Sequence, residues 1–232
     1  MRKQPLIIIL FGQPGSGKGV QAGLLADKLR LYYLETSKLI ESRVMTAKEG
    51  EYVKVGAKKY FLTNEKKLWQ SGILCSPPFV NFLVKQKIKE LFKNKQGIIL
   101  AGSPRTLIEG KEQIPLLKKT YGLENIKVFF LKISPEETLW RNSRRRICQL
   151  MRHSIVSTKE TERLTLCPLD GSKLVRREGL DDPETIKVRL KEYKERTLPL
   201  IKYFKQEGLK IKNINGEQSI ESVFKAILKF IK

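Results

Sequence analysis

Five short apolar segments recur along the chain, and the stretches between them carry apolar residues every three or four positions. The apolar segments are 6–11, 31–34, 98–101, 127–133 and 210–214. Apolar runs of this length are typical of strands buried on both faces of a parallel sheet, and the intervening spacing is that of amphipathic helices. The pattern predicts an α/β fold, a three-layer sandwich with a five-stranded parallel sheet between helices.

The clearest helical pattern closes the chain. Its apolar side chains lie on one stripe, which is expected to be core: Ile220, Val223, Phe224, Ile227, Leu228 and Ile231. Two earlier helices have marked starts. Ser134 and Asp182 are each followed by proline and then glutamate, which combines a capping side chain, a proline at the first helical position and an acid in the first turn.

Two regions interrupt the alternation of strands and helices. Residues 36–76 are expected to be mostly helical with no strand, while 148–180 is rich in turn formers and carries two cysteines. Both are interpreted as insertions able to move over the edge of the sheet where α/β proteins bind ligands. The rest is predicted to form one core domain, made of 1–35, 77–147 and 181–232.

Composition narrows the class of protein. No apolar run approaches the roughly 20 residues that span a bilayer, and no signal peptide is evident, so we expect a soluble cytoplasmic protein without a membrane partner. Three cysteines cannot all pair with each other, which fits a reducing compartment.

The net charge of +22 favours anionic ligands. Because the lysines are spread through helical stretches such as 85–95, nucleic acid is not expected as the main partner.

The segment after the first strand carries the most specific chemistry. Gly12, Gly15, Gly17 and Lys18 fit the pattern G-x-x-x-x-G-K. In such a loop the small residues let backbone N–H groups surround phosphate oxygens, and the lysine reaches the terminal ones. An apolar strand precedes the loop and a helical pattern follows it, so the positive end of a helix would face the anion. The loop predicts a protein that binds a nucleotide phosphate.

Four arginines extend this prediction. Arg105 follows the strand 98–101, and Arg189 lies in a later helical stretch. Arg141 and Arg145 are four residues apart and are expected to share one face of a helix. The planar guanidinium suits bidentate binding of phosphate, and phosphoryl transfer needs cations around the moving group.

With these residues placed, the chain resembles the adenylate kinase family of nucleoside monophosphate kinases. The loop GQPGSGKGVQ is similar to that family's G-x-P-G-x-G-K-G-T-Q, and AGSPRT to its D-G-F-P-R-T. WRNSRRRIC resembles the R-x-x-x-R-R segment that opens the lid. LDDPETIKVRL and RTLPLIKYF resemble its D-D-x-x-E-T-x-x-x-R-L and T-x-P-L-I-x-Y. Order and spacing agree from residue 5 to residue 232.

The resemblance implies an enzyme that transfers the γ-phosphoryl of ATP reversibly to a nucleoside monophosphate, with Mg²⁺ and with AMP as the expected acceptor. We expect it to be a monomer, although the sequence does not determine the oligomeric state. Insertion 36–76 would bind the monophosphate, with an extra stretch around residues 47–60, and 148–180 would form the lid. The implied catalytic residues are Lys18, Arg105, Arg145 and Arg189. Those implied for ATP are Gly12, Pro14, Gly15, Ser16, Gly17, Lys18, Gly19, Val20, Arg141 and Arg145. Those implied for the monophosphate are Thr36, Arg43, Leu74, Cys75, Gly102, Arg105, Glu109 and Arg189.

Four positions depart from the family pattern. Val20 replaces a threonine and Ala101 an aspartate, so Mg²⁺ would be bound more weakly or by other residues. Glu41 replaces an arginine for the monophosphate, a role that the nearby Arg43 could partly fill. Glu109 replaces a glutamine that would read adenine, and a carboxylate suits guanine better. Two alternatives therefore stay open: a kinase preferring GMP or another monophosphate, and a nucleotide-binding regulatory module with little turnover.

The lid raises a separate question about metal. Its segments starting at Cys148 and Cys167 resemble the two knuckles that hold a structural zinc in some family members. Met151 stands at a ligand position of the first knuckle, and a thioether is a poor zinc ligand. His153, the only histidine, would complete a set with Cys148, Cys167 and Asp170. The alternative is a metal-free lid held by packing and hydrogen bonds.

Overall fold

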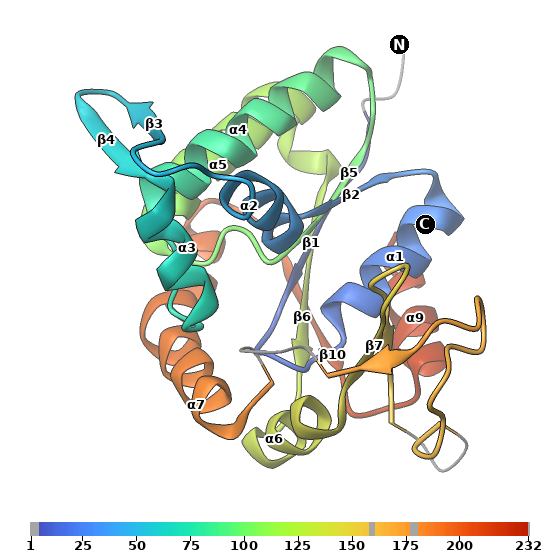
Figure 1. The fold of residues 1–232 in the computed structure, drawn as a ribbon. Helices are drawn as coiled ribbons and strands as arrows, with labels where there is room; N and C mark the ends of the chain where they lie inside the picture. Colours follow the sequence, from blue (N-terminus) through green and yellow to red (C-terminus); the bar gives the residue numbers. More distant parts are fainter. Residues whose placement is uncertain (1–4, 158–160, 177–180, 232) are drawn as a thin grey trace.

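The computed structural model describes residues 5–157, 161–176 and 181–231. Its central sheet has five strands in the order β10-β6-β1-β5-β2 (Figure 1). All four neighbouring pairs run parallel, which confirms the predicted fold class. In chain order the strands are β1 (Ile7–Phe11), β2 (Tyr32–Glu35), β5 (Ile98–Ala101), β6 (Ile126–Lys132) and β10 (Ile211–Asn215).

The strand bounds differ from the predicted ones by one residue in places. The second strand was expected at 31–34, yet β2 runs from Tyr32 to Glu35. The backbone of Glu35 continues the ladder because Ala101 at the end of β5 is its register partner. The strand therefore carries a carboxylate to the edge of the sheet.

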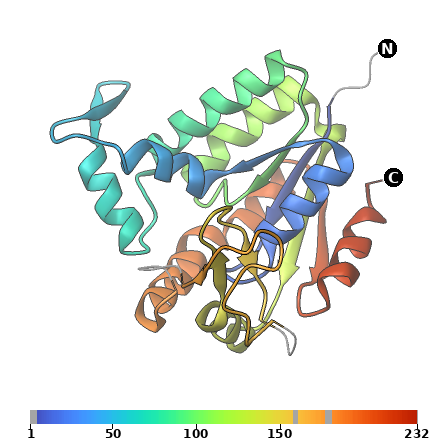
Figure 2. The same cartoon turned by 45° about the vertical axis from the view of Figure 1, so that its right-hand side comes forward.

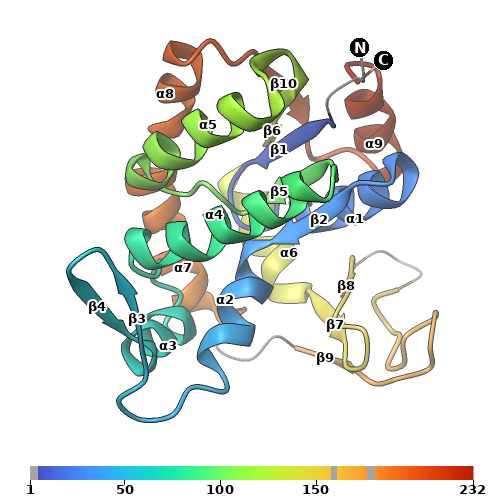
Figure 3. The ribbon, with the colours of Figure 1, turned by 90° about the horizontal axis from the view of Figure 1, so that it is seen from above.

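Helices cover both faces of the sheet (Figure 3). Helices α1 (Lys18–Leu29) and α9 (Ile220–Leu228) cover one face, and α4 (Pro77–Lys93), α5 (Leu107–Tyr121) and α8 (Leu200–Gln206) cover the other. The strands β1 and β5 are buried along their whole length because each side is covered in this way. Burial of these side chains drives the folding of the core.

The insertion at 36–76 contains a hairpin, so the prediction of no strand there was wrong. Helix α2 (Thr36–Val44) is followed by β3 (Tyr52–Val55) and β4 (Lys58–Phe61), and then by α3 (Leu62–Gln70). The turn has two residues and begins at Gly56, whose φ of 60° suits the first position of a hairpin turn. Surrounding lysines obscured the alternating pattern, in which Val53 is buried.

The region of the predicted lid contributes a second small sheet, which Figure 2 brings to the front of the view. Helix α6 (Pro135–Arg144) leads into β7 (Arg146–Cys148), which pairs antiparallel with β8 (Ser154–Ile155) and β9 (Leu174–Val175). The chain then returns to the core through α7 (Pro183–Glu192).

The remaining short elements are a 3₁₀ turn, η1 (Leu123–Asn125), and a π-helical turn, η2 (Tyr193–Thr197). Both predicted helix starts are confirmed, because Ser134 accepts a hydrogen bond from the Glu137 amide and Asp182 from the Thr185 amide. Within the described residues no helix has the length and apolar character needed to cross a membrane.

Candidate functional site

A cavity of about 720 Å³ lies at the carboxyl ends of the strands. The loop after β1, the end of β5, helix α6 and the lid residues 154–157 form its walls. A smaller cavity of about 80 Å³ adjoins it and is lined in part by residues of the insertion at 36–76. Gly102, Arg105 and Arg189 line both cavities, so these residues mark the junction between the two.

All ten residues predicted for ATP line the larger cavity. Glycine is required in the loop for steric reasons. A Cβ at Gly12 would lie 2.5 Å from the Leu131 carbonyl oxygen, and one at Gly15 would lie 2.6 Å from Asn142 Nδ2. Gly17, at φ 85°, begins helix α1 without a side-chain cap, which leaves the amides of the first turn available to an anion.

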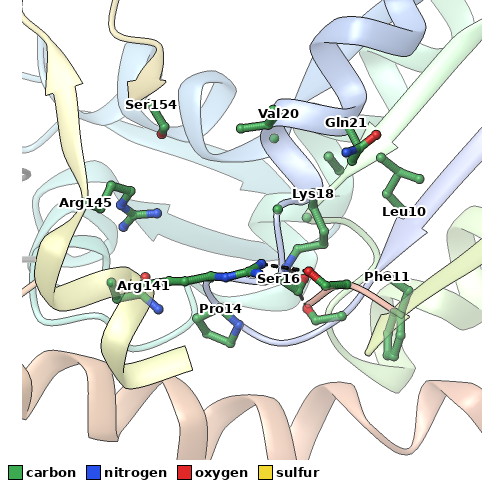
Figure 4. A pocket seen from close by; sticks show the side chains of 18 of the residues that line it. Leu10, Phe11, Pro14, Ser16, Lys18, Val20, Gln21, Arg141, Arg145 and Ser154 are labelled. Atoms are coloured by element: carbon green, nitrogen blue, oxygen red, sulfur yellow. Dashed lines mark hydrogen bonds between the residues drawn. The ribbon is translucent and has the colours of Figure 1, made fainter. Parts of the chain in front are cut away.

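Lys18 lies at the base of this loop (Figure 4). Its Nζ donates to the carbonyl oxygens of Gly12 and Gln13 at 2.7 and 2.8 Å. Burial lowers the pKa of Lys18 well below its ordinary value, and three neighbouring arginines lower it further. These arginines are Arg105, Arg189 and Arg145. A polyphosphate would neutralise this cluster of positive charge.

Arg105 follows β5 on a loop held by a carboxylate. Glu109, only 2% exposed, accepts the backbone N–H of Arg105 at 2.8 Å and the hydroxyls of Ser103 at 3.3 Å and Thr106 at 3.2 Å. Thr106 in turn accepts the Glu109 amide and caps α5. Burial raises the pKa of Glu109. The carboxylate therefore stabilises the loop that carries Arg105.

Arg145 was expected on α6 beside Arg141, and this was wrong. The helix ends at Arg144, and Arg145 is extended with ψ 134°. Arg145 still lines the cavity. Its Nε donates a hydrogen bond to Asp181 at 2.9 Å, which holds the side chain in place. Figure 4 shows Arg141 and Arg145 entering the cavity from the side of α6 and the lid.

Asp181 is a site residue that sequence reasoning missed. Its side chain is 3% exposed and lies 3.7 Å from Arg189 as well as in contact with Arg145. The adjacent Asp182 could be recognised from the sequence as a helix cap because a proline follows it. Nothing in the sequence distinguished Asp181 from it as a partner for arginines. One buried carboxylate thus holds two of the four predicted catalytic arginine and lysine side chains.

Arg141 is fixed at the other end of the cavity. Its Nε donates to Glu137 at 2.5 Å and its NH1 to the Gly216 carbonyl at 2.9 Å. Ile220 lies beside this wall with 40% of its surface exposed, so its assignment to the core stripe was wrong. A held guanidinium and an apolar side chain offer a surface on which a base can stack.

Seven of the eight residues predicted for the monophosphate line the smaller cavity. Thr36 is 2% exposed, and its hydroxyl has no partner among the described residues. Arg43 is the exception. It forms a 2.8 Å ion pair with Glu51, the residue before β3, and is not among the residues that line the smaller cavity. Its role toward the monophosphate stays a prediction.

The predicted lid residues do come together. The ligand atoms of Cys148, His153, Cys167 and Asp170 all lie within 4.8 Å of one another. Cys148 Sγ is 2.9 Å from an Asp170 oxygen, and Cys167 Sγ is 3.3 Å from His153 Nε2. Met151 is 63% exposed and is not part of this group. Four donors of this kind at this separation fit a tetrahedral zinc site.

Comparisons with known proteins agree with this geometry. A family model described as adenylate kinase matches residues 10–209. The adenylate kinase of Petrotoga mobilis is 30% identical over 97% of both chains. That of Chlamydia pneumoniae is 33% identical over 97% of both chains, and that of Mycoplasma capricolum is 33% identical over 93% of this chain and 96% of its own.

Proposed function

Because this chain belongs to the adenylate kinase family, we propose that it transfers the γ-phosphoryl of ATP to AMP, reversibly, giving two ADP. One observation supports this most strongly. Arg105 and Arg189 line both cavities at their junction, next to Lys18 and the phosphate loop. A donor on the loop and an acceptor in the smaller cavity would meet between these cations.

The proposed catalysis consists of positioning and charge neutralisation. The loop amides and Lys18 would hold the donor phosphates, while Arg105 and Arg189 would orient the acceptor phosphate in line with the γ-phosphorus. The acceptor oxygen forms the new P–O bond as the bond to the ADP oxygen breaks, and no covalent enzyme intermediate is needed. The lid residues 154–157 line the cavity and would exclude water as a competing acceptor.

Adenylate kinases use ATP with Mg²⁺, and the bound ion would supply further positive charge to the transferring phosphates. Hard oxygen donors suit this ion. Ser16 and Glu35 supply such donors on the wall of the larger cavity, so the residues present fit an ATP-bound Mg²⁺.

Adenine is favoured over guanine by the hydrogen bonds of Glu109. A carboxylate accepts at about four positions, and three hydrogen bonds to Glu109 come from its own loop. Little acceptor capacity is left for the N1–H and amino group of guanine. This weakens the argument for GMP that rested on the residue type alone.

The second candidate is a nucleotide-binding module with little turnover. It is supported by Val20 and Ala101, which line the cavity without offering an oxygen. Product analysis separates the two functions. With ATP, AMP and Mg²⁺, ³¹P NMR should show two ADP formed per ATP consumed, and ADP alone should yield ATP and AMP. Tight ATP binding without either conversion would support the module and exclude the kinase.

We further propose that the lid binds zinc through Cys148, His153, Cys167 and Asp170, because the four donors already lie together. Such a site would tie the two knuckles of the lid to each other. Metal analysis of the purified protein should find about one zinc per chain, and Cys167→Ser should lose it. The matched control is Cys75→Ser, which removes a buried thiol outside the group. Equal zinc in the wild type and Cys167→Ser would contradict the proposal.

All three cysteines lie outside any disulfide bond, which suits a reducing compartment, so we place the enzyme in the cytoplasm. Both nucleotide cavities are lined by residues of one chain. We therefore propose that it works as a monomer.

A further inference from the structure

Near the phosphate loop, the wall of the larger cavity has two apolar side chains at positions where the family pattern has oxygen-bearing ones. Val20 and Ala101 both face the cavity there, where the family pattern has a threonine and an aspartate. An ATP-bound Mg²⁺ keeps several water molecules and needs oxygen atoms to orient them. The question is which side chain of this protein supplies them.

Glu35 lies directly beside Ala101. It is the last residue of β2 and the register partner of Ala101 at the end of β5. Paired residues on neighbouring strands are about 4.8 Å apart. A glutamate is one methylene longer than an aspartate, so its carboxylate can reach across the width of one strand.

The alternation of side chains places Glu35 on the correct face. Tyr33 and Ile99 are partners that pack on the α1 side of the sheet, and Leu34 and Leu100 are partners on the opposite side. Ala101 belongs to the α1 side. Glu35 is two residues after Tyr33, so it shares that side with the phosphate loop and lines the same cavity.

We propose that Glu35 replaces the carboxylate missing at Ala101 and holds Mg²⁺·ATP by accepting hydrogen bonds from the water bound to the ion. This inference rests on the proposed kinase function for its ligand. Compared with the family pattern, this chain has its carboxylate at the end of β2 instead of the end of the neighbouring β5. A carboxylate would thus still be present at the edge of the sheet where ATP is proposed to bind.

The other carboxylates on the cavity wall are less suited to this role. Glu137 lies at the start of α6, Glu217 between β10 and α9, and Glu221 in the first turn of α9, at the end where Arg141 would contact the base. Glu192 is on α7 and is held by a salt bridge on its own helix turn. Among the described carboxylates that line the cavity, Glu35 lies at the end of a strand of the central sheet, and β5 separates that strand from the one that leads into the phosphate loop.

The surroundings of Glu35 leave it able to bind. One oxygen accepts a hydrogen bond from Ser37 at 3.3 Å, and the other lies 3.1 Å from Lys38, whose side chain is 55% exposed. Exposed pairs of this kind are weak. The negative charge of Glu35 also acts on Arg105 across the cavity. A carboxylate has acceptor positions beyond these two contacts.

Manganese binding gives a test that does not depend on turnover. Mn²⁺ is titrated into the enzyme–ATP complex, and the free ion is followed by its EPR signal. Glu35→Ala should weaken Mn²⁺ binding about tenfold or more, the range found when a group that orients metal ligands is removed. ATP binding measured with EDTA should stay close to that of the wild type, which shows that the variant is folded and its loop intact.

The double variant Glu35→Ala with Ala101→Asp is the matched rescue, and it should restore Mn²⁺ affinity. Unchanged Mn²⁺ affinity in Glu35→Ala would overturn the inference. So would a loss that Ala101→Asp does not restore while ATP binding with EDTA is normal. If Mn²⁺ binding behaves as expected but no phosphoryl reaches AMP, the proposed function fails and the assignment of Glu35 stands.

Discussion

The site is built from side chains that are costly to bury unless a phosphate is present. Lys18 donates to two loop carbonyls but also faces Arg105, Arg145 and Arg189, whose positive charges lower its pKa further. Asp181 and Glu109 offset part of this charge from behind. Single substitutions in this cluster should therefore affect function and stability differently.

We expect Lys18→Met to lower the turnover number about a hundredfold or more, because it removes a cation from the developing charge on the phosphoryl group. Its effect on stability depends on pH. Burial lowers the pKa of Lys18 in the folded state, so the unfolded chain binds more protons between that lowered value and the ordinary one. Wild-type stability therefore rises with pH in that window, relative to the variant.

The check is urea denaturation of both proteins without nucleotide, between about pH 7 and pH 10. The difference in unfolding free energy should shift toward the wild type as the pH rises. A difference that is constant with pH would show that Lys18 is not held at a lowered pKa.

A second prediction concerns Asp181, which is 3% exposed and contacts Arg145 and Arg189. Asp181→Asn removes the charge that both guanidinium groups face, and breaking a buried pair in this way costs about 3 kcal/mol. We expect a loss of that order in the free energy of unfolding, together with a lower turnover number because both arginines lose their fixed positions.

Asp182→Asn is the control for this change. Asp182 caps α7 at the protein surface, and asparagine caps a helix equally well. Its unfolding free energy should stay within about 0.5 kcal/mol of the wild type. If the two variants behave alike in chemical denaturation, Asp181 has no special role.

At the level of elements, the sheet was predictable because its inner strands β1 and β5 are entirely apolar and helical patterns separate the five apolar segments. The hairpin of the insertion was not, because the alternation of Val53 and Val55 with lysine and tyrosine spans only four residues. The end of α6 was missed for a different reason. Arg144 and Arg145 have the same side chain, so the residue types do not mark the helix end, whereas in the structure Arg145 is extended and its side chain contacts Asp181.

The alternation of buried and exposed side chains along β3 can be tested by a pair of substitutions. Val53 is 6% exposed and packs in the core, whereas its neighbour Lys54 is exposed. Val53→Asp should destabilise the protein by at least about 2 kcal/mol, because it buries a charge without a partner. Lys54→Asp should stay within about 0.5 kcal/mol of the wild type. Thermal unfolding of both measures this, and equal losses would mean that β3 does not alternate in and out.

At the level of the whole molecule, the sequence predicted which residues line the site better than how they are held there. The loop glycines and Lys18 were evident because phosphate binding needs those residue types at that spacing. Asp181 and the hydrogen bonds of Glu109 were not evident, since they depend on which segments meet in space. The net charge of +22 is only partly used by the cavity, and most lysines remain exposed on helices such as α4.

The central claim is that both cavities serve one reaction with AMP as acceptor. The most direct measurement is the steady-state rate of nucleoside diphosphate formation from ATP and Mg²⁺ with AMP, GMP, CMP or UMP. We predict the highest kcat/KM with AMP and rates near background with GMP. Transfer to GMP that exceeds transfer to AMP, or no transfer to any of the four by protein that binds ATP, would contradict the claim.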